Sequence, residues 1–348
     1  MIPLLKNTYR FLVNFVRIFF SRILKVTSKG LRHEVVVIYD SPNVFDGFGA
    51  QLHRILSLIH VSNQFNLRMW KPRIDQITLH PLDPIKTVEE MRQYLVSCEQ
   101  IFFQSALYLT DYPDLISTEK RSAPSLNLTI LCKAIFLSFF FRKPYMLTVQ
   151  EAHSIADLEV HSYWKSIQLY FESFLDTHVS SRKNNELIIH YRQGAGNFAV
   201  YPGQSISRQM PVNYFMNMTD KVITNTGLNF ARIRVFTDSP KTDLVFFPVR
   251  EQIHLWEQSP GFDGSKLTHK GLDVEPHFQS IGFKNNIPIT VERNLGPAEM
   301  IIEMANAAAL ITSRSSLSYV AGLFNSSGLV VSAPEFWHTK PRQWISGR

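Results

Sequence analysis

The sequence has few of the residues that cross-link small domains or hold metals. It contains two cysteines in 348 residues, Cys98 and Cys132, and they lie in separate segments. Neither a disulfide framework nor a Cys-x-x-Cys or Cys/His zinc spacing is present. With 45% hydrophobic residues the chain is long enough to bury two cores, so two domains are expected.

Acidic residues are missing from the first 33 positions, and this sets the charge of the whole protein. Seven Lys and Arg residues occur there without any Asp or Glu. The formal net charge is +7, and removing these seven from the 36 basic residues leaves 29, which equals the 29 acidic residues. The rest of the chain is formally neutral, which argues against a general nucleic-acid-binding surface.

The N-terminal segment lacks an uncharged run long enough to span a membrane, because Arg17 interrupts the apolar stretch. A secretory signal is not expected either, since no small-residue cleavage site follows. Polar residues recur every three or four positions from Lys6 to Ser28, which predicts a helix with one polar stripe and a broad apolar face. We expect residues 1–30 to lie on an anionic membrane surface; the alternative is an ordinary amphipathic helix packed on the protein's own core.

From residue 34 onward the chain alternates strand and helix patterns. Residues 35–39 form a β-branched apolar run typical of a buried parallel strand, and a glycine-containing loop leads to a helical pattern over 50–63. The polar segment 178–185 is the best candidate linker. Between these segments we expect strands at 100–104 and 143–149 and helices at 126–141 and 163–176.

A second α/β series follows the linker. We therefore predict an α/β protein with two Rossmann-like doubly wound domains facing a cleft. The expected divisions are a basic amphipathic helix over 1–33 and domains over 34–180 and 181–348. In the second domain we expect strands at 186–192, 233–237, 242–247, 310–312 and 328–332, and helices at 212–223, 297–308 and 317–324.

The strand that ends at Arg192 carries the strongest candidate site. Residues two apart in a strand point to the same face, so His190 and Arg192 project together while Tyr191 points away. Ligands of open α/β sheets bind beyond the carboxyl ends of the strands, where a guanidinium offers a planar fork of donors to a diphosphate. The alternative is a core histidine beside a salt-bridged arginine.

Two further segments are expected at the same edge of the sheet. The turn from Ser313 to Ser316 stands between a strand and a helix, where hydroxyls, a guanidinium and free backbone N–H groups would hold phosphate oxygens. Asp238 follows the strand at 233–237. A serine-rich turn is often only a helix cap, and Asp238 also fits a plain turn.

Together these segments resemble the GDP-fucose-dependent fucosyltransferase superfamily, which includes α1,2-, α1,6- and protein O-fucosyltransferases and has the GT-B fold. One departure from the family pattern is Ala50, which stands where relatives commonly have Asn. The matching motifs, in chain order, are Gly47-Phe48-Gly49-Ala50-Gln51, His190-Tyr191-Arg192-Gln193-Gly194, Phe236-Thr237-Asp238-Ser239-Pro240, and Glu299 followed by Ser315-Ser316.

The resemblance implies a donor site for a nucleotide-diphosphate sugar, with GDP-fucose as the expected donor. His190 would lie beside the guanine, Arg192 would contact the diphosphate, and Glu299 would read the guanine edge, with Glu303 as an alternative. No Asp-x-Asp pattern for Mn²⁺ or Mg²⁺ occurs, so we expect neither a metal nor a further cofactor. The remaining donor-binding residues would be Gly47, Gly49, Gly194, Asp238, Ser313, Arg314, Ser315 and Ser316.

The reaction that follows from the resemblance is an inverting transfer of the sugar to a hydroxyl of a glycan or glycolipid. Arg192 would stabilise the charge on the departing diphosphate. Asp46 resembles an acidic residue in one branch of protein O-fucosyltransferases and is our candidate general base; Glu151 and His153, on the acceptor side, are the others. We expect a cytoplasmic enzyme, peripheral on the membrane. A different donor, or a non-catalytic binding protein with the same fold, is the alternative.

Overall fold

The computed structural model describes two compact units. The described residues of the first unit lie within Met1–Asn43, Gln51–Ile77 and Arg92–Phe174, and those of the second within Val44–Ala50 and Leu175–Arg348. The residues described are 2–32, 34–39, 48–70, 120–123, 125–178, 184–192, 210–238, 241–242, 244–246, 267–269, 272–293 and 295–347. The strand expected at 100–104 lies outside them.

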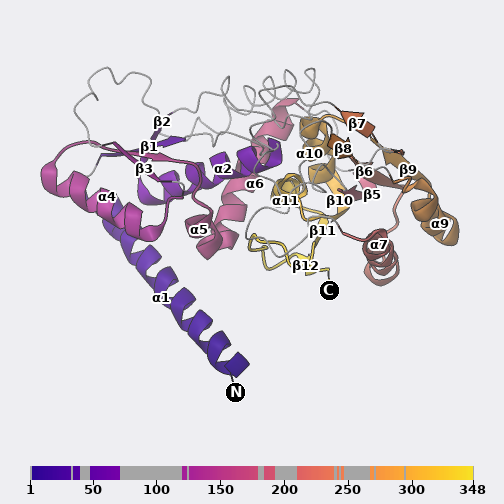
Figure 1. Ribbon diagram of the computed structural model, residues 1–348, viewed down its shortest axis with the longest axis horizontal. Helices are drawn as coiled ribbons and strands as arrows, with labels where there is room; N and C mark the ends of the chain where they lie inside the picture. Colours follow the sequence, from indigo (N-terminus) through magenta and orange to yellow (C-terminus); the bar gives the residue numbers. More distant parts are fainter. Residues whose placement is uncertain are drawn as a thin grey trace. The chain divides into compact units, whose positions relative to one another are not determined.

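The first unit contains a parallel sheet in the order β2-β1-β4-β3, of which β1, β2 and β3 are labelled in Figure 1. Its inner strands, β1 (Val35–Tyr39) and β4 (Tyr145–Val149), are almost entirely buried, as their unbroken apolar sequences predict. The outer strands are β2 (Arg68–Trp70) and β3 (Lys120–Ala123). The helices of this part of the chain are α1 (Ile2–Gly30), α2 (Phe48–Phe65), α4 (Leu128–Phe141), α5 (His153–Ala156) and α6 (Val160–His178).

The second unit contains a larger parallel sheet in the order β12-β11-β10-β5-β6-β9. Its strands are β5 (Asn184–Tyr191), β6 (Arg232–Thr237), β9 (Ile289–Glu292), β10 (Ala307–Ile311), β11 (Leu329–Ser332) and β12 (Ile345–Ser346). Its helices are α7 (Val212–Thr226), α9 (Glu275–Asn285), α10 (Pro297–Asn306) and α11 (Ser316–Phe324). The strand expected at 242–247 is β7 (Leu244–Phe246), which pairs with β8 (Leu267–His269) in a separate antiparallel ribbon.

In the second unit, successive strands are added first on one side of β5 and then on the other. The chain adds β6 and then β9 on one side of β5, and afterwards returns to add β10, β11 and β12 on the other side. The carboxyl ends of β5 and β10 therefore form a topological switch point, where the two flanking loops diverge to opposite faces of the sheet. In open parallel sheets of this order, ligands bind at such a point.

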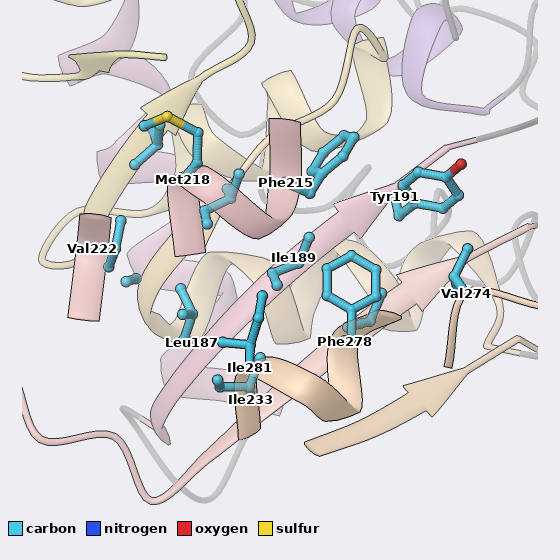
Figure 2. Packing of buried hydrophobic residues seen from close by; sticks show 14 of the residues in the cluster. Leu187, Ile189, Tyr191, Phe215, Met218, Val222, Ile233, Val274, Phe278 and Ile281 are labelled. Atoms are coloured by element: carbon cyan, nitrogen blue, oxygen red, sulfur yellow. The ribbon is translucent and has the colours of Figure 1, made fainter. Parts of the chain in front are cut away.

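In the second unit, alternate residues of β5 point to opposite faces of the sheet. Leu187, Ile189 and Tyr191 point into the layer formed by α7 and α9, where the ring of Tyr191 lies 5.2 Å from that of Phe215 and 6.3 Å from that of Phe278 (Figure 2). Because strand side chains alternate, His190 is directed to the opposite face of the sheet.

The structure confirms the predicted fold class: an α/β protein with parallel sheets in two units and a helix at its N-terminus. The first helix of the α/β region, predicted over 50–63, is α2, and the helix predicted over 212–223 is α7. None of the helices described is both long and apolar enough to cross a membrane.

Candidate functional site

His190 lies at the carboxyl end of β5, next to the turn that follows β10. Its Nδ1 is 2.8 Å from Oγ of Ser313, and the imidazole is buried, with 4% of the residue exposed. Burial lowers the pKa of His190 to about 4, while Asp238 acts to raise it and Arg192 to lower it further. The ring is therefore neutral at pH 7, and its direct effect is to position Ser313.

Arg192 is the residue that connects the predicted segments. Its Nη1 donates a hydrogen bond to Oγ of Ser315 at 3.1 Å, and its Nε lies 3.8 Å from a carboxylate oxygen of Asp238. The strands before these residues, β5, β6 and β10, are parallel neighbours, so their carboxyl ends share one edge of the sheet. The sequence-predicted residues His190, Arg192, Asp238, Ser313 and Ser315 are thus brought together.

The turn after β10 is organised as a helix start. Ser315 is the N-cap of α11 and accepts a hydrogen bond from the backbone N–H of Leu317 at 3.3 Å. Ser318 closes the turn from inside, because its Oγ accepts the backbone N–H of Ser313 at 3.2 Å. The same serine hydroxyl that caps the helix also receives the Arg192 guanidinium, so a positive side chain and the positive end of a helix dipole converge here.

The guanidinium of Arg314 contacts the loop that follows β11. Its Nε donates to the carbonyl oxygen of Pro334 at 3.0 Å, and its Nη2 lies 3.0 Å from a carboxylate oxygen of Glu335. These contacts fix the loop after β11 against the turn after β10. Arg314 thus borders the candidate site while part of its guanidinium is engaged elsewhere.

Gly49 brings a second helix start to the same place. A Cβ added at Gly49 would lie 2.4 Å from Cα and 2.5 Å from N of Leu317, so only glycine allows this approach. Gly49 is in the first turn of α2, and Leu317 is in the first turn of α11. The first turns of two helices therefore meet beside Ser315, and the amino-terminal end of a helix favours an anion.

The two acidic candidates on α10 have different surroundings. Glu299 is exposed, in the first turn of the helix. Glu303 is bound by Nη1 of Arg234 at 2.5 Å, within a network in which Arg234 also holds Glu292 through two hydrogen bonds of 2.6 and 2.8 Å. Glu303 therefore has a structural role in this network, and of the two residues only Glu299 presents an open carboxylate.

The first unit holds the acceptor-side candidates in one polar cluster. A carboxylate oxygen of Glu151 lies 3.2 Å from Nε2 of His153, and the His153 ring stacks on the His53 ring with 4.1 Å between centroids. His53, which is buried in α2, was not among the residues predicted from the sequence. Its position within a helical apolar pattern gave no signal of contact with residues a hundred positions away.

Three predicted site residues, Asp46, Gly47 and Gly194, lie outside the described residues. Of the residues that are described, Ser316 begins α11 and is half-buried, next to the N-cap Ser315.

No family model matches the sequence, and no curated protein sequence matches it significantly. The structure is similar to that of POFUT1 in complex with GDP, with 8% identity over 86% of this chain and 97% of that chain and a TM-score of 0.40. It is also similar to Escherichia coli heptosyltransferase WaaC with ADP-2-deoxy-2-fluoro heptose, with 7% identity over 90% of this chain and 92% of that chain and a TM-score of 0.36. The similarity to these glycosyltransferases is distant. The roles proposed for residues of this chain are therefore argued from the geometry of its own site.

Proposed function

We propose that the protein is a glycosyltransferase of the GT-B type whose second unit binds the diphosphate of a nucleotide sugar. The observation that carries this proposal is the bond between Arg192 and Ser315 at the start of α11, located at the switch point between β5 and β10. A guanidinium and two helix starts, with Gly49 packed on Leu317, match the charge and the size of a diphosphate.

The same groups suit the chemistry of sugar transfer. When the bond between the sugar and the diphosphate breaks, negative charge grows on the β-phosphate, and oriented dipoles and a fixed cation lower the energy of that state. Arg192 and the N–H groups of α11 would supply this stabilisation, and Ser313, held by His190, would add a hydroxyl. The transfer is proposed to be inverting and independent of metal, and the resemblance of the sequence motifs favours GDP-fucose as the donor.

On the acceptor side, the general base is proposed to come from the first unit. A carboxylate that contacts an imidazole fixes the orientation of the ring and raises its basicity, and Glu151 and His153 have this relationship. Asp46 is the other candidate base. The acceptor is proposed to be a hydroxyl of a glycan or glycolipid.

Nucleotide binding provides the test. The thermal unfolding of wild-type protein is measured with GDP, ADP and UDP, and transfer or hydrolysis is measured with GDP-, ADP- and UDP-linked sugars. We expect GDP to raise the melting temperature, and Arg192→Ala to weaken GDP binding by about 10- to 100-fold, because a charged hydrogen bond is worth roughly 1.5–3 kcal/mol. Arg342→Ala, an exposed arginine of the same unit, is the control.

Two results would contradict the proposal. The first is that none of the three nucleotides stabilises the protein and none of the sugars is consumed. The second is that Arg192→Ala binds GDP as tightly as Arg342→Ala does. Stabilisation by ADP or UDP in place of GDP would keep the fold and the site but change the donor, and nucleotide binding without turnover would favour the non-catalytic alternative.

We also propose that the protein is cytoplasmic and binds an anionic membrane peripherally through residues 1–30. The orientation of the C-terminal half of α1 supports this proposal, because two serines of its polar stripe face the first unit: Ser21 is 2% exposed and Ser28 is fully buried. The aromatic face points outward, with Phe15 at 59% and Phe20 at 58% exposure. The apolar face, whose contact with water is unfavourable, is thus the one exposed to solvent. Flotation with anionic vesicles of wild-type protein and of Phe15→Ser/Phe20→Ser tests this proposal, which is wrong if both float equally.

A further inference from the structure

A second helix of the first unit, α4, exposes an aromatic surface beside α1. Its core-facing residues are spaced as expected for one helical face, at Leu131, Ala134, Ile135 and Ser138. The opposite side is not polar: Phe136 is 58% exposed, and Phe140 and Phe141 are each 66% exposed. Scattered exposed apolar residues are ordinary in soluble proteins, whereas several phenylalanines at the end of one helix form a patch.

The apolar surfaces of the two helices are continuous. Helices α1 and α4 contact each other (Figure 1), and between them lies a groove of about 490 Å³. The wall and floor of the groove are almost entirely apolar, so no polar strip separates one exposed face from the other. The residues that line it include Leu24 and Thr27 of α1, Leu31 directly after α1, and Ile135, Phe136 and Phe139 of α4.

The charges on the two helices themselves are of one sign. Neither α1 nor α4 contains an aspartate or a glutamate. Exposed cations stand at the border of the apolar surface on both helices: Arg22 and Lys29 on α1, and Lys133, Arg142 and Lys143 on or directly after α4. Arg22 and Lys29 are seven residues apart and so lie on the same side of α1, away from the side that lines the groove.

We propose that α4 and α1 form one docking surface for an anionic lipid bilayer, with Phe136, Phe140 and Phe141 entering the interface between headgroups and acyl chains. This inference rests on the proposed membrane binding of α1 and adds a second element to it. An aromatic surface on two helices that carry cations and no acidic residue complements a bilayer whose interior is apolar and whose headgroups are negative. Two helices side by side also fix the orientation of the first unit on the membrane, which one helix does not, because it leaves rotation about its own axis free.

The test uses full-length protein and flotation on vesicles of phosphatidylcholine with and without phosphatidylglycerol. The variant Phe136→Ser/Phe140→Ser/Phe141→Ser removes the apolar contribution of α4, and Lys133→Gln/Arg142→Gln/Lys143→Gln removes its charges. Phe283→Ser is the matched control, since Phe283 of the second unit is 85% exposed. We expect each α4 variant to bind phosphatidylglycerol vesicles at least about tenfold more weakly than wild type, and the control to bind like wild type.

Unchanged thermal unfolding and unchanged nucleotide-induced stabilisation show that the α4 variants are folded. If the serine variant fails to fold, the glutamine variant still decides, because its three positions are exposed. The inference is overturned if folded α4 variants float like wild type while Phe15→Ser/Phe20→Ser does not, a result that leaves the role of α1 intact. It is also overturned if wild-type protein forms a lipid-independent dimer that the serine variant dissociates, because a second copy of the chain would then cover this surface.

Discussion

The guanidinium of Arg192 bonds to the hydroxyl of Ser315 across 123 positions of sequence. Arg192 follows β5, and Ser315 follows β10 and caps α11. A single hydrogen bond therefore links the segments that leave the two strands of the topological switch point. This relationship joins two ordinary local features, a strand end and a helix cap, into one site in which a guanidinium meets the positive end of a helix.

The close contact between Gly49 and Leu317 predicts that Gly49→Ala is destabilising. The new Cβ would stand 2.4 Å from Cα of Leu317, and backbone atoms cannot move aside as a flexible side chain does. We expect a loss of about 1–3 kcal/mol in the free energy of unfolding, measured with urea, and weaker nucleotide binding. Gly30→Ala is the control, since nothing lies within 4 Å of a Cβ at that position. Equal stability of the two variants would show that Gly49 does not approach the backbone of Leu317 in this way.

The buried imidazole of His190 predicts that acid destabilises the protein before the carboxylates titrate. Its pKa is lowered from 6.5 to about 4, so between these values the unfolded chain binds a proton that the folded protein does not. The stability contributed by the neutral ring is therefore complete above pH 6.5 and is lost as the pH falls toward 4. Burial lowers the pKa of His60 in the first unit to about 3, which acts in the same direction.

Two measurements check this dependence on pH. The melting temperature is expected to fall between pH 7 and pH 5, and to fall less steeply in His190→Gln and in His60→Gln. NMR titration of the imidazole resonances is expected to show both rings neutral at pH 5. A His190 ring that titrates near its ordinary pKa would mean that it is open to water, which the structure contradicts.

The Arg234 network predicts a large effect from a residue outside the proposed site. Arg234 contacts Glu292, Glu303 and Glu186, so Arg234→Met leaves three carboxylates close together without their shared cation. We expect a loss of about 3–5 kcal/mol in the free energy of unfolding, as is typical when one partner of a buried ion pair is removed. Arg232→Met, which affects a more exposed guanidinium bound to Glu186, is expected to cost less. Equal losses in the two variants would contradict the central role of Arg234.

The contact between Glu151 and His153 predicts a catalytic effect without a loss of donor binding. Glu151→Gln keeps the size of the side chain but removes the charge that faces Nε2 of His153. If this pair accepts the proton of the acceptor, kcat is expected to fall by about 10²- to 10⁴-fold, while stabilisation by the nucleotide is unchanged. Asp220→Asn, which affects an exposed ion pair with Lys284 in the second unit, is the control. Full activity of Glu151→Gln would leave Asp46 as the candidate base.

The sequence by itself determined the local structure and the direction of the key side chains. Apolar β-branched runs gave the buried strands β1 and β5, helical spacing gave α2, α4 and α7, and the two-residue period of a strand placed His190 and Arg192 on the face away from Tyr191. These features depend on residues close together in the chain, so a local pattern is enough to predict them.

Only the tertiary structure decided which of these elements meet. The pairing of β10 with β5 brings Ser315 to Arg192, the contact of Gly49 with the backbone of Leu317 makes glycine necessary there, and the stack of His153 on His53 joins two segments of the first unit. The same is true of α1, whose pattern is equally consistent with burying either face, and in which Ser21 and Ser28 of the polar stripe are the buried residues. A strand's neighbours and a helix's buried face are chosen by contacts between distant segments, and no local period encodes that choice.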